Sequence, residues 1–469
     1  MLTEHSAQDT APSPDTPAPA RQGTWSALRP LVMRLHFYAG LLIAPFLLVA
    51  ALSGFLYALS YQAEKIVYRQ ELEVPVGDSI QPLAEQVDAA RRTHPDGTVT
   101  AVWPSPEDGA TTRVLMASPE VEEGKSLAVF VDPYTAEVRG ALPSYGSSGA
   151  LPLRTWLSEL HRDLHLGEPG RIYSELAASW LWVLALAGLA LWAGRRRTRK
   201  RALFLPERGP RSRRRTLSWH GSVGLWATAG LLGLSATGLT WSTYAGENVD
   251  ALRERLGATT PSVSATLDGT DGADAGHEGH EGHGAGHRPA TRTGAGIGID
   301  RAVRIAAEAG VEGRIAVSPP TDGKGYVVKE IDRHYPVHQD SVAIDPANGA
   351  VLDTLRFADY PLLAKLTSIG IAAHMGTFLG LPNQLALAAL ALAVVALIVW
   401  GYRMWWLRRP GRPVAPGAWR KVPATMLLPL AAVIALVGWF LPLLGLSLLA
   451  FLLVDGARSL VARRRARSA

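Results

Sequence analysis

Long apolar runs separated by polar segments dominate this chain of 469 residues. Several runs approach the roughly 20 consecutive apolar residues that a helix needs to cross a lipid bilayer. They lie near residues 36–58, 176–194, 219–241, 384–406, 424–440 and 441–455. The pattern therefore predicts an all-α polytopic membrane bundle, in which four core transmembrane helices are followed by a C-terminal transmembrane hairpin.

Two longer polar segments, between the first and second runs and between the third and fourth, have a different pattern. A helical spacing of apolar residues at 81–92 precedes three short alternating runs, which indicates a helix followed by strands. The same order returns from residue 299 onward, and an Asp-Pro turn occurs in both segments, at Asp132 and at Asp345. We therefore expect two small α+β domains outside the bundle, related as repeats.

Basic residues gather beside the apolar runs and set the expected orientation. Arginine-rich clusters lie at 195–201, 211–215, 403–412 and 463–467, and such clusters mark the cytoplasmic side of membrane helices. Both termini are therefore expected in the cytoplasm, and the two α+β domains on the outer side of the cell membrane. Although the formal charge is +6, its distribution favours contact with membrane lipid over nucleic acid. The absence of cysteine excludes disulfides, iron–sulfur clusters and thiolate metal sites.

These patterns divide the chain into membrane, outer and cytoplasmic parts. The first half comprises a disordered cytoplasmic tail (1–30), a first span (31–59), a first outer domain (60–150), an approach helix with the second span (151–194) and a basic cytoplasmic loop (195–216). The second half comprises a third span (217–243), a disordered His-rich outer linker (244–298), a second outer domain (299–358), an approach helix with the fourth span (359–407), a cytoplasmic linker (408–423), the hairpin (424–457) and a basic tail (458–469).

The first and third spans open with the same spacing of histidine and glycine. His36 is followed by Gly40 four positions later and by Gly54 after eighteen. Positions i and i+4 share a helix face, and eighteen residues make about five turns, or roughly 27 Å of rise. Each helix would then carry an imidazole near one membrane surface and an open notch near the other. The second copy consists of His220, Gly224 and Gly238.

The approach helices carry a second duplicated motif. His161 is followed six positions later by a glycine and then by a proline, and His374 has the same pattern. The chain is therefore a duplicated unit of span, outer domain, approach helix and span. In the expected topology, His36 and His220 lie at the cytoplasmic ends of their spans, whereas His161 and His374 lie at the outer ends of theirs.

Two histidine pairs at two depths are what axial ligation of two stacked haems requires, and the four glycines would leave room for the macrocycles. A transition-metal site or pathway is a second interpretation, although it would favour carboxylates within the spans. Close helix packing through small residues is a third interpretation, and it needs no cofactor.

The motifs that carry a family resemblance are Leu35-His36-x3-Gly40-Leu41, Leu160-His161-Arg162-Asp163-Leu164, Trp219-His220-x3-Gly224-Leu225, His374-x-Gly376 and the two Asp-Pro turns. In this order they resemble the PepSY-associated transmembrane family, which includes iron-regulated membrane proteins and siderophore-type ferric reductases. The resemblance covers residues from about 30 to 410. It implies two bis-histidine haem b groups and electron transfer to an outer ferric chelate, as in iron uptake. It also favours His161 over its neighbour His165 as a ligand.

A histidine-rich insertion in the outer linker departs from that family pattern, as does the C-terminal hairpin. Neutral imidazoles beside Glu278 and Glu281 suit Zn²⁺, Cu²⁺ or Ni²⁺, but a merely solvated linker is an equal alternative. The candidate metal ligands are His277, His280, His283 and His287.

We therefore expect a di-haem membrane oxidoreductase that draws electrons from the inner side and reduces an extracytoplasmic ferric or other metal complex. No Gly-x-Gly-x-x-Gly sequence opens a βαβ unit, so the electrons would come from quinol or from a separate reductase. The competing hypothesis is a non-enzymatic PepSY protein that binds metal or restrains a partner outside the cell.

Overall fold

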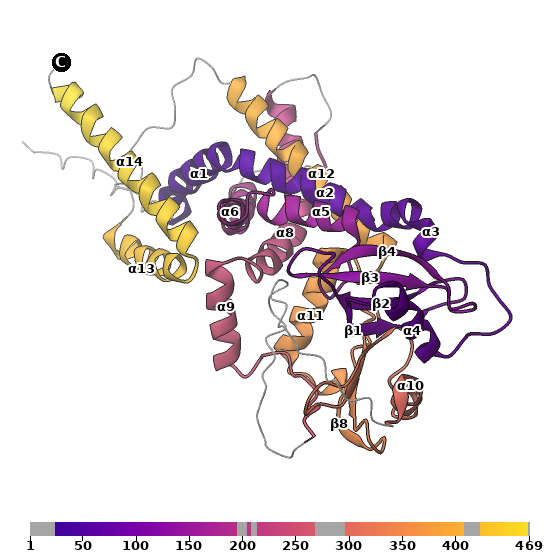
Figure 1. The fold of residues 1–469 in the computed structure, drawn as a ribbon. Coiled ribbons are helices and arrows are strands. Elements are labelled where there is room, and N and C mark those ends of the chain that lie inside the picture. The colour runs from indigo at the N-terminus through magenta and orange to yellow at the C-terminus, as the bar shows by residue number, and fades with distance from the viewer. Residues whose placement is uncertain (1–23, 195–203, 208–212, 268–295, 408–422, 468–469) are drawn as a thin grey trace, which may run out of the picture.

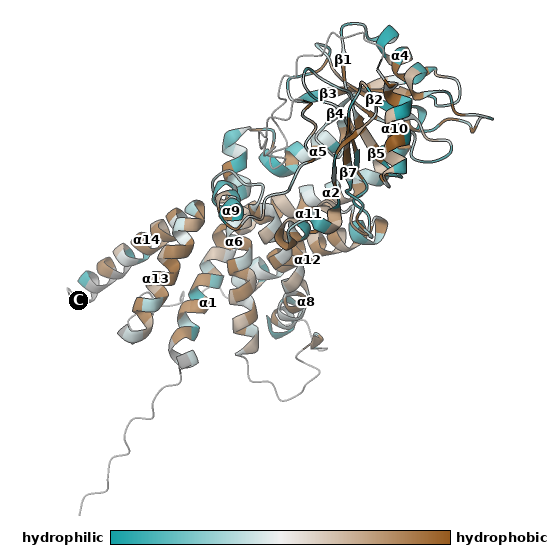
Figure 2. Ribbon diagram, turned by 90° about the horizontal axis from the view of Figure 1, so that it is seen from below, coloured by the Kyte–Doolittle hydropathy of each residue, from teal (hydrophilic) through white to brown (hydrophobic). Residues whose placement is uncertain are grey.

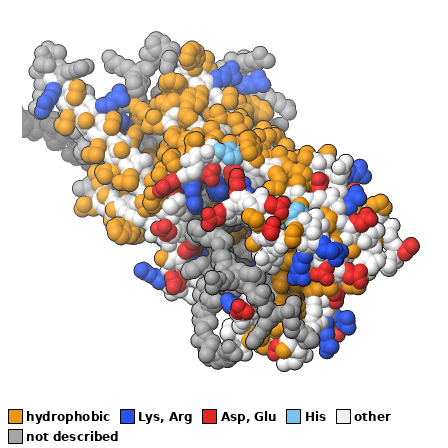
Figure 3. All heavy atoms as spheres, viewed as in Figure 1, with side chains coloured by type: hydrophobic (Ala, Val, Ile, Leu, Met, Phe, Trp, Pro, Cys, Tyr) orange, Lys and Arg blue, Asp and Glu red, His pale blue; other side chains and the backbone are white. Residues whose placement is uncertain are grey.

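The computed structural model describes residues 24–194, 204–207, 213–267, 296–407 and 423–467. It consists of a helical bundle with an antiparallel sheet domain at one end (Figures 1 and 2). The face of the bundle seen in Figure 3 is largely hydrophobic, whereas charged side chains gather over the sheet domain. Within the described residues, the helices long and apolar enough to cross a membrane are α2 (Ala44–Val67), α6 (Glu168–Ala193), α8 (Arg213–Leu239) and α12 (Leu381–Trp406).

The sheet has eight antiparallel strands in the order β4-β3-β2-β1-β5-β6-β7-β8. Its two halves come from the two polar segments, and they meet where β1 pairs with β5, with Val102 opposite Val317. An unpaired edge exposes a row of backbone N–H and C=O groups, so this pairing covers one edge of each half. The strands are β1 (Thr98–Trp103), β2 (Thr112–Ala117), β3 (Lys125–Val131), β4 (Val138–Tyr145), β5 (Ile315–Ser318), β6 (Tyr326–Glu330), β7 (Ser341–Ile344) and β8 (Val351–Leu355).

Two helices, α4 (Leu83–Thr93) and α10 (Gly298–Glu308), pack against the sheet and contact one another. Ile299 and Val303 of α10 pack against the core that α4 forms with β1, β2 and β3. The halves therefore share one continuous hydrophobic core as well as one sheet.

The predicted all-α fold class is wrong, because this large sheet accompanies the bundle. The two α+β segments that we expected as separate small domains are joined across β1 and β5. Hydrophobic alternation marks a strand within its own segment, but it does not show which edges will pair between distant segments.

Each half of the sheet contains the same turn before its last strand. The Asp132 side chain accepts a hydrogen bond from the backbone N–H of Tyr134 at 2.8 Å. The Asp345 side chain accepts one from the backbone N–H of Ala347, also at 2.8 Å. Both aspartates thus close the turn over their own backbone, and the repeat seen in the sequence extends to these hydrogen bonds.

The first apolar run forms two helices where we expected one span. One residue, Ile43, separates the end of helix α1 (Thr24–Leu42) from the start of α2. Pro45 has no N–H to donate to the carbonyl of Leu41, and the Tyr402 hydroxyl donates to that carbonyl instead, at 2.9 Å. His36 and Gly54 therefore lie on different helices, so the rise expected for one straight helix does not apply. Helix α1 also includes the end of the predicted tail.

Two approach helices, α5 (Pro152–Asp163) and α11 (Leu362–Met375), lead from the sheet into the bundle. Each is followed by a glycine in nearly the same conformation: Gly167 has φ 64° and ψ −133°, and Gly380 has φ 60° and ψ −133°. This region is essentially restricted to glycine. The next helix, α6 or α12, then begins with a proline in its first turn. The two halves therefore turn into the bundle in the same way.

The C-terminal helices α13 (Ala424–Phe440) and α14 (Pro442–Arg467) are not among the helices that, over the described residues, are long and apolar enough to cross a membrane, so the structure does not support the predicted transmembrane hairpin there. Helix α13 is 17 residues long, and α14 continues into the arginine-rich end that was expected to be a tail. The pair is nevertheless attached to the bundle. Arg34 of α1 forms an ion pair with Asp455, and Trp180 of α6 donates to Ser447 at 2.9 Å.

The predicted disordered linker begins instead with a helix, α9 (Tyr244–Arg255). The buried carboxylate of Glu175 accepts hydrogen bonds from the backbone N–H groups of Tyr244 and Ala245, each at 3.0 Å. These N–H groups lie in the first turn of α9, where they have no partner within the helix. The short elements α3 (Arg69–Leu72) and η1 (Phe357–Asp359) complete the described fold.

Candidate functional site

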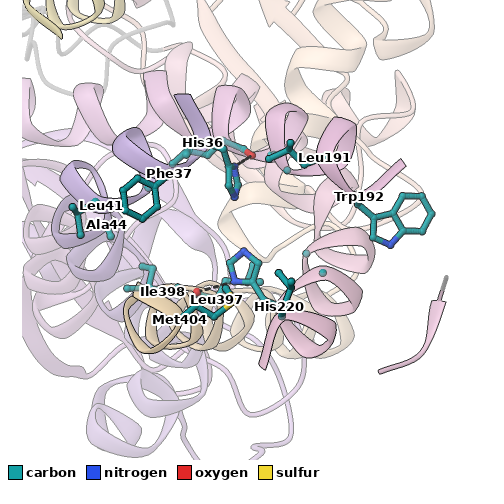
Figure 4. A pocket seen from close by; sticks show the side chains of 18 of the residues that line it. His36, Phe37, Leu41, Ala44, Leu191, Trp192, His220, Leu397, Ile398 and Met404 are labelled. Atoms are coloured by element: carbon teal, nitrogen blue, oxygen red, sulfur yellow. Dashed lines mark hydrogen bonds between the residues drawn. The ribbon is translucent and has the colours of Figure 1, made fainter. Parts of the chain in front are cut away.

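The histidines of the first and third spans face one another inside the bundle. His36 comes from α1 and His220 from α8, and their ring centroids are 6.2 Å apart with planes at 79°. Figure 4 shows the two imidazoles pointing toward each other across a cavity. This His36–His220 cavity has a volume of about 470 Å³.

The histidines of the approach helices form a second facing pair. His161 of α5 and His374 of α11 have ring centroids 6.5 Å apart and planes at 64°. They line a cavity of about 260 Å³, the His161–His374 cavity. This cavity is the one nearer the sheet, because α5 also packs against β4. The four motif histidines are thus brought together as two pairs.

Each histidine of the first pair donates to a backbone carbonyl. The Nδ1 of His36 lies 3.1 Å from the oxygen of Leu184 on α6, and the Nδ1 of His220 lies 3.1 Å from the oxygen of Leu397 on α12. A carbonyl can only accept, so the proton must be on Nδ1. In the neutral imidazole the lone pair is then on Nε2.

In the second pair, hydroxyl groups take the place of the backbone carbonyls and accept from the Nδ1 atoms. The Ser53 hydroxyl donates to the carbonyl of Val49 and therefore accepts from the Nδ1 of His161, at 2.9 Å. The Thr237 hydroxyl donates to the carbonyl of Gly233 at 2.8 Å and accepts from the Nδ1 of His374 at 2.6 Å. All four imidazoles are thus held as Nδ1–H tautomers. Histidines that bind metals typically have this kind of outer hydrogen bond.

The spacing of both pairs fits two nitrogens on opposite sides of one metal atom. Metal–nitrogen bonds of about 2.0–2.1 Å, with about 1.1 Å from each nitrogen to its ring centre, place facing imidazole centres roughly 6.3 Å apart. The observed separations of 6.2 and 6.5 Å agree with that value. The residues present therefore fit bis-imidazole ligation of a haem in each cavity.

All four predicted glycines line these cavities. Gly40 and Gly224 line the His36–His220 cavity, and Gly54 and Gly238 line the His161–His374 cavity. A Cβ atom added at Gly54 would lie 3.2 Å from the His161 ring, and one at Gly238 would lie 3.8 Å from the His374 ring. A side chain at either position would therefore extend into the space around the imidazole.

Sequence reasoning missed several residues that share this repeat. Gly188 and Gly401 line the His36–His220 cavity on α6 and α12, and a Cβ at Gly188 would lie 3.1 Å from His36. Gly188 and Gly401 are 213 positions apart, which is also the separation of His161 and His374. The hydroxyl residues Ser53 and Thr237 were missed as well. They are 184 positions apart, which is also the separation of His36 and His220. Comparing the two halves at these offsets would have found all four.

A single layer of aliphatic side chains separates the two cavities. Four residues line both of them, one from each of the four long helices, and they too form repeat pairs at the same two offsets. These residues are Leu47, Leu181, Leu231 and Val394.

The remaining histidines lie elsewhere. His165 is not among the lining residues of either cavity, and its ring stacks on Trp156 with centroids 4.9 Å apart. The cluster proposed for metal binding, His277, His280, His283 and His287, lies outside the described residues. Among the residues that are described, no three histidine or acidic side chains are close enough together to hold a metal ion.

A buried ion pair holds α5, and hence His161, against α2. Arg154 donates to Glu64 at 2.9 Å, and both side chains are only 6% exposed. Glu64 also accepts from the backbone N–H groups of Leu151 and Arg154 at the start of α5. The carboxylate thus accepts hydrogen bonds both from backbone N–H groups at the start of α5 and from a buried guanidinium.

Replacing Glu64 by alanine is expected to destabilise the protein by about 3–5 kcal/mol, because it leaves Arg154 buried without its partner. The matched control is Glu73→Ala, which removes an ion pair with Arg69 whose side chains are 75% and 54% exposed. That change should cost only about 0–1 kcal/mol. Thermal unfolding in detergent would compare the two, and equal losses would show that the buried pair has no special role.

Comparison with known proteins places this architecture in a family. The chain matches no curated protein. Residues 33–408 match the family described as the PepSY-associated TM region, and that range covers all four long apolar helices, both histidine pairs and the whole sheet. The resemblance noted from the motifs is therefore confirmed, and the chain belongs to the PepSY-associated TM family of membrane proteins.

Proposed function

We propose that this protein carries electrons across the membrane through two haem b groups, one held by His36 and His220 and the other by His161 and His374. The observation that carries the proposal is the pair of facing imidazole couples at 6.2 and 6.5 Å, every one donating through Nδ1. A bound haem would supply a one-electron Fe³⁺/Fe²⁺ couple.

The side chains of this site favour electron transfer over chemistry at the iron. A haem held by an imidazole from each side would have no position open for oxygen or a substrate to bind at its iron. The Nδ1–H donors keep each ring oriented and make it a better ligand. The role of the protein is therefore to hold the two redox groups at fixed positions in an apolar setting.

The aliphatic layer supports transfer between the two sites. Leu47, Leu181, Leu231 and Val394 are shared by both cavities, so only one layer of side chains lies between them. None of the four can bind or release a proton. We infer that electrons cross this layer while protons and water do not.

Helix packing through glycine alone does not account for these cavities. Packing through small residues brings helix backbones close together, whereas spaces of about 470 and 260 Å³ lie between the helices here. Spaces of this size beside paired imidazoles favour a bound cofactor.

The arginine-rich clusters in the sequence favour an orientation with both termini in the cytoplasm and the sheet domain outside. In this proposal, electrons enter from the cytoplasmic side. The donor would be quinol or a separate reductase. The acceptor would be a ferric chelate of the siderophore type, or another metal complex, near the sheet, because the His161–His374 cavity lies at that end.

We expect the purified protein to bind two haems and to show the reduced-minus-oxidised spectrum of a low-spin haem b. After stoichiometric reduction, stopped-flow mixing with a ferric hydroxamate chelate should reoxidise both haems. A chain without haem bands would favour the non-enzymatic alternative. A haem-loaded chain that no ferric chelate reoxidises would retain the cofactor assignment but exclude this class of acceptor.

A further inference from the structure

Two arginines line the His36–His220 cavity at equivalent positions of the repeat. Arg29 precedes His36 by seven residues, and Arg213 precedes His220 by seven. Seven residues are about two helical turns, so each guanidinium is on the same side of its helix as the imidazole. The cavity thus has two cations, one from α1 and one from α8.

The two positive charges of this cavity are not balanced by negative charges among its described lining residues. Among the described residues that line it there is no aspartate or glutamate. Apart from the two arginines, the lining is mostly aliphatic and aromatic, with residues such as Phe37, Trp192 and Leu397. A mainly apolar cavity with two cations and no acid is complementary to a flat, apolar ligand that has two negative groups.

Other arginines nearby do not share this placement. Arg214 follows Arg213 directly, yet it is not among the cavity's lining residues and instead pairs with Glu207 at 3.1 Å. A general excess of positive charge at the end of a membrane helix would not select one of two adjacent arginines.

The His161–His374 cavity is different. Its lining includes Arg162 and Arg171, but it also includes the acid Glu175. Arg162 already donates to the Tyr145 hydroxyl at 2.7 Å and to Asp163 at 3.3 Å. An unbalanced pair of cations is therefore a feature of the His36–His220 cavity and not of the His161–His374 cavity.

We propose that Arg29 and Arg213 each bind one carboxylate of the haem in the His36–His220 cavity, and so fix which edge of the macrocycle faces the end of the bundle away from the sheet. This proposal rests on the proposed function, since it assumes that a haem occupies the cavity. Both arginines are positioning residues: they select one orientation and neutralise the carboxylates, whereas the imidazoles hold the iron.

Arg29→Gln and Arg213→Gln test the proposal, with Arg214→Gln as the matched control. Oxidised haem has one more positive charge than reduced haem, so loss of a nearby cation should favour the oxidised form. We expect the ratio of reduced to oxidised haem at a fixed potential to fall by about tenfold, which is a midpoint lower by about 59 mV for a one-electron couple. Only one of the two haems should respond, and Arg214→Gln should leave both midpoints unchanged.

A second measurement separates carboxylate binding from a purely electrostatic effect. The propionate bending bands of haem in resonance Raman spectra respond to hydrogen bonds at the carboxylates. They should shift in Arg29→Gln and Arg213→Gln and return toward the original position in Arg29→Lys, because lysine restores a donor and the charge. If the bands are the same in all variants while haem remains bound, the arginines do not bind the carboxylates. If the unmodified protein has no haem, the proposed function itself has failed.

Discussion

Replacing His36 or His220 by alanine should lower the haem content of the purified protein by about half, because each haem needs both of its imidazoles for low-spin bis-histidine ligation. The two rings are 6.2 Å apart and face one cavity, so either change removes a ligand from the same group. His161→Ala and His374→Ala should remove the other half. Pyridine haemochrome assays per mole of chain would measure the loss.

Combined substitutions test the pairing more sharply than single ones. A double change within one pair, His36→Ala with His220→Ala, should cost no more haem than either single change. A double change across pairs, His36→Ala with His161→Ala, should leave almost none. His165→Ala is the control, since its ring stacks on Trp156 outside both cavities. Full haem content in all four single variants would disprove the assignment.

The histidine pairs could be predicted because each histidine motif occurs twice in the chain, once in each half. A single histidine at a helix end is uninformative, but four histidines at two repeated offsets restrict which rings can meet. The helix α11 was predicted in the same way, because the glycine and proline that follow His374 repeat those that follow His161. The repeat of each motif, more than any single residue, therefore carries this prediction.

The joined sheet could not be predicted in the same way. Alternating residues identified strands on both sides of the third span, but the pairing of β1 with β5 depends on two edges meeting in space. The register of this pairing sets Val102 opposite Val317, and no local pattern encodes it. The break between α1 and α2 was easier to predict from the sequence, because Pro45 lies inside the first apolar run.

The hydrogen bonds that the histidines make through Nδ1 could be predicted only in part. Ser53 and Thr237 precede the notch glycines Gly54 and Gly238 directly, but a hydroxyl in an apolar helix usually bonds its own backbone and attracts no notice. Only the structure shows that each hydroxyl also accepts from an imidazole. Their role follows from geometry that residue type alone does not determine.

Replacing Gly54 by leucine should remove the haem of the His161–His374 cavity and leave the other in place. A Cβ at this position already lies 3.2 Å from the His161 ring, and that ring cannot easily move, because Ser53 holds its Nδ1 at 2.9 Å. Overpacking of this kind costs about 1–3 kcal/mol, which corresponds to roughly 5- to 150-fold weaker binding. Gly54→Ala should give a smaller loss, since alanine adds only the Cβ.

The matched control is Gly233→Leu on α8, where an added Cβ would meet nothing within 4 Å. Both changes put a leucine in place of a glycine in a long apolar helix, so they alter hydropathy and helix propensity alike. They differ in what the new side chain contacts. Haem content and reduced-minus-oxidised spectra should therefore fall by one haem in Gly54→Leu and remain unchanged in Gly233→Leu. If Gly54→Leu keeps both haems at full occupancy, the macrocycle does not lie against α2, and the glycine serves helix packing instead.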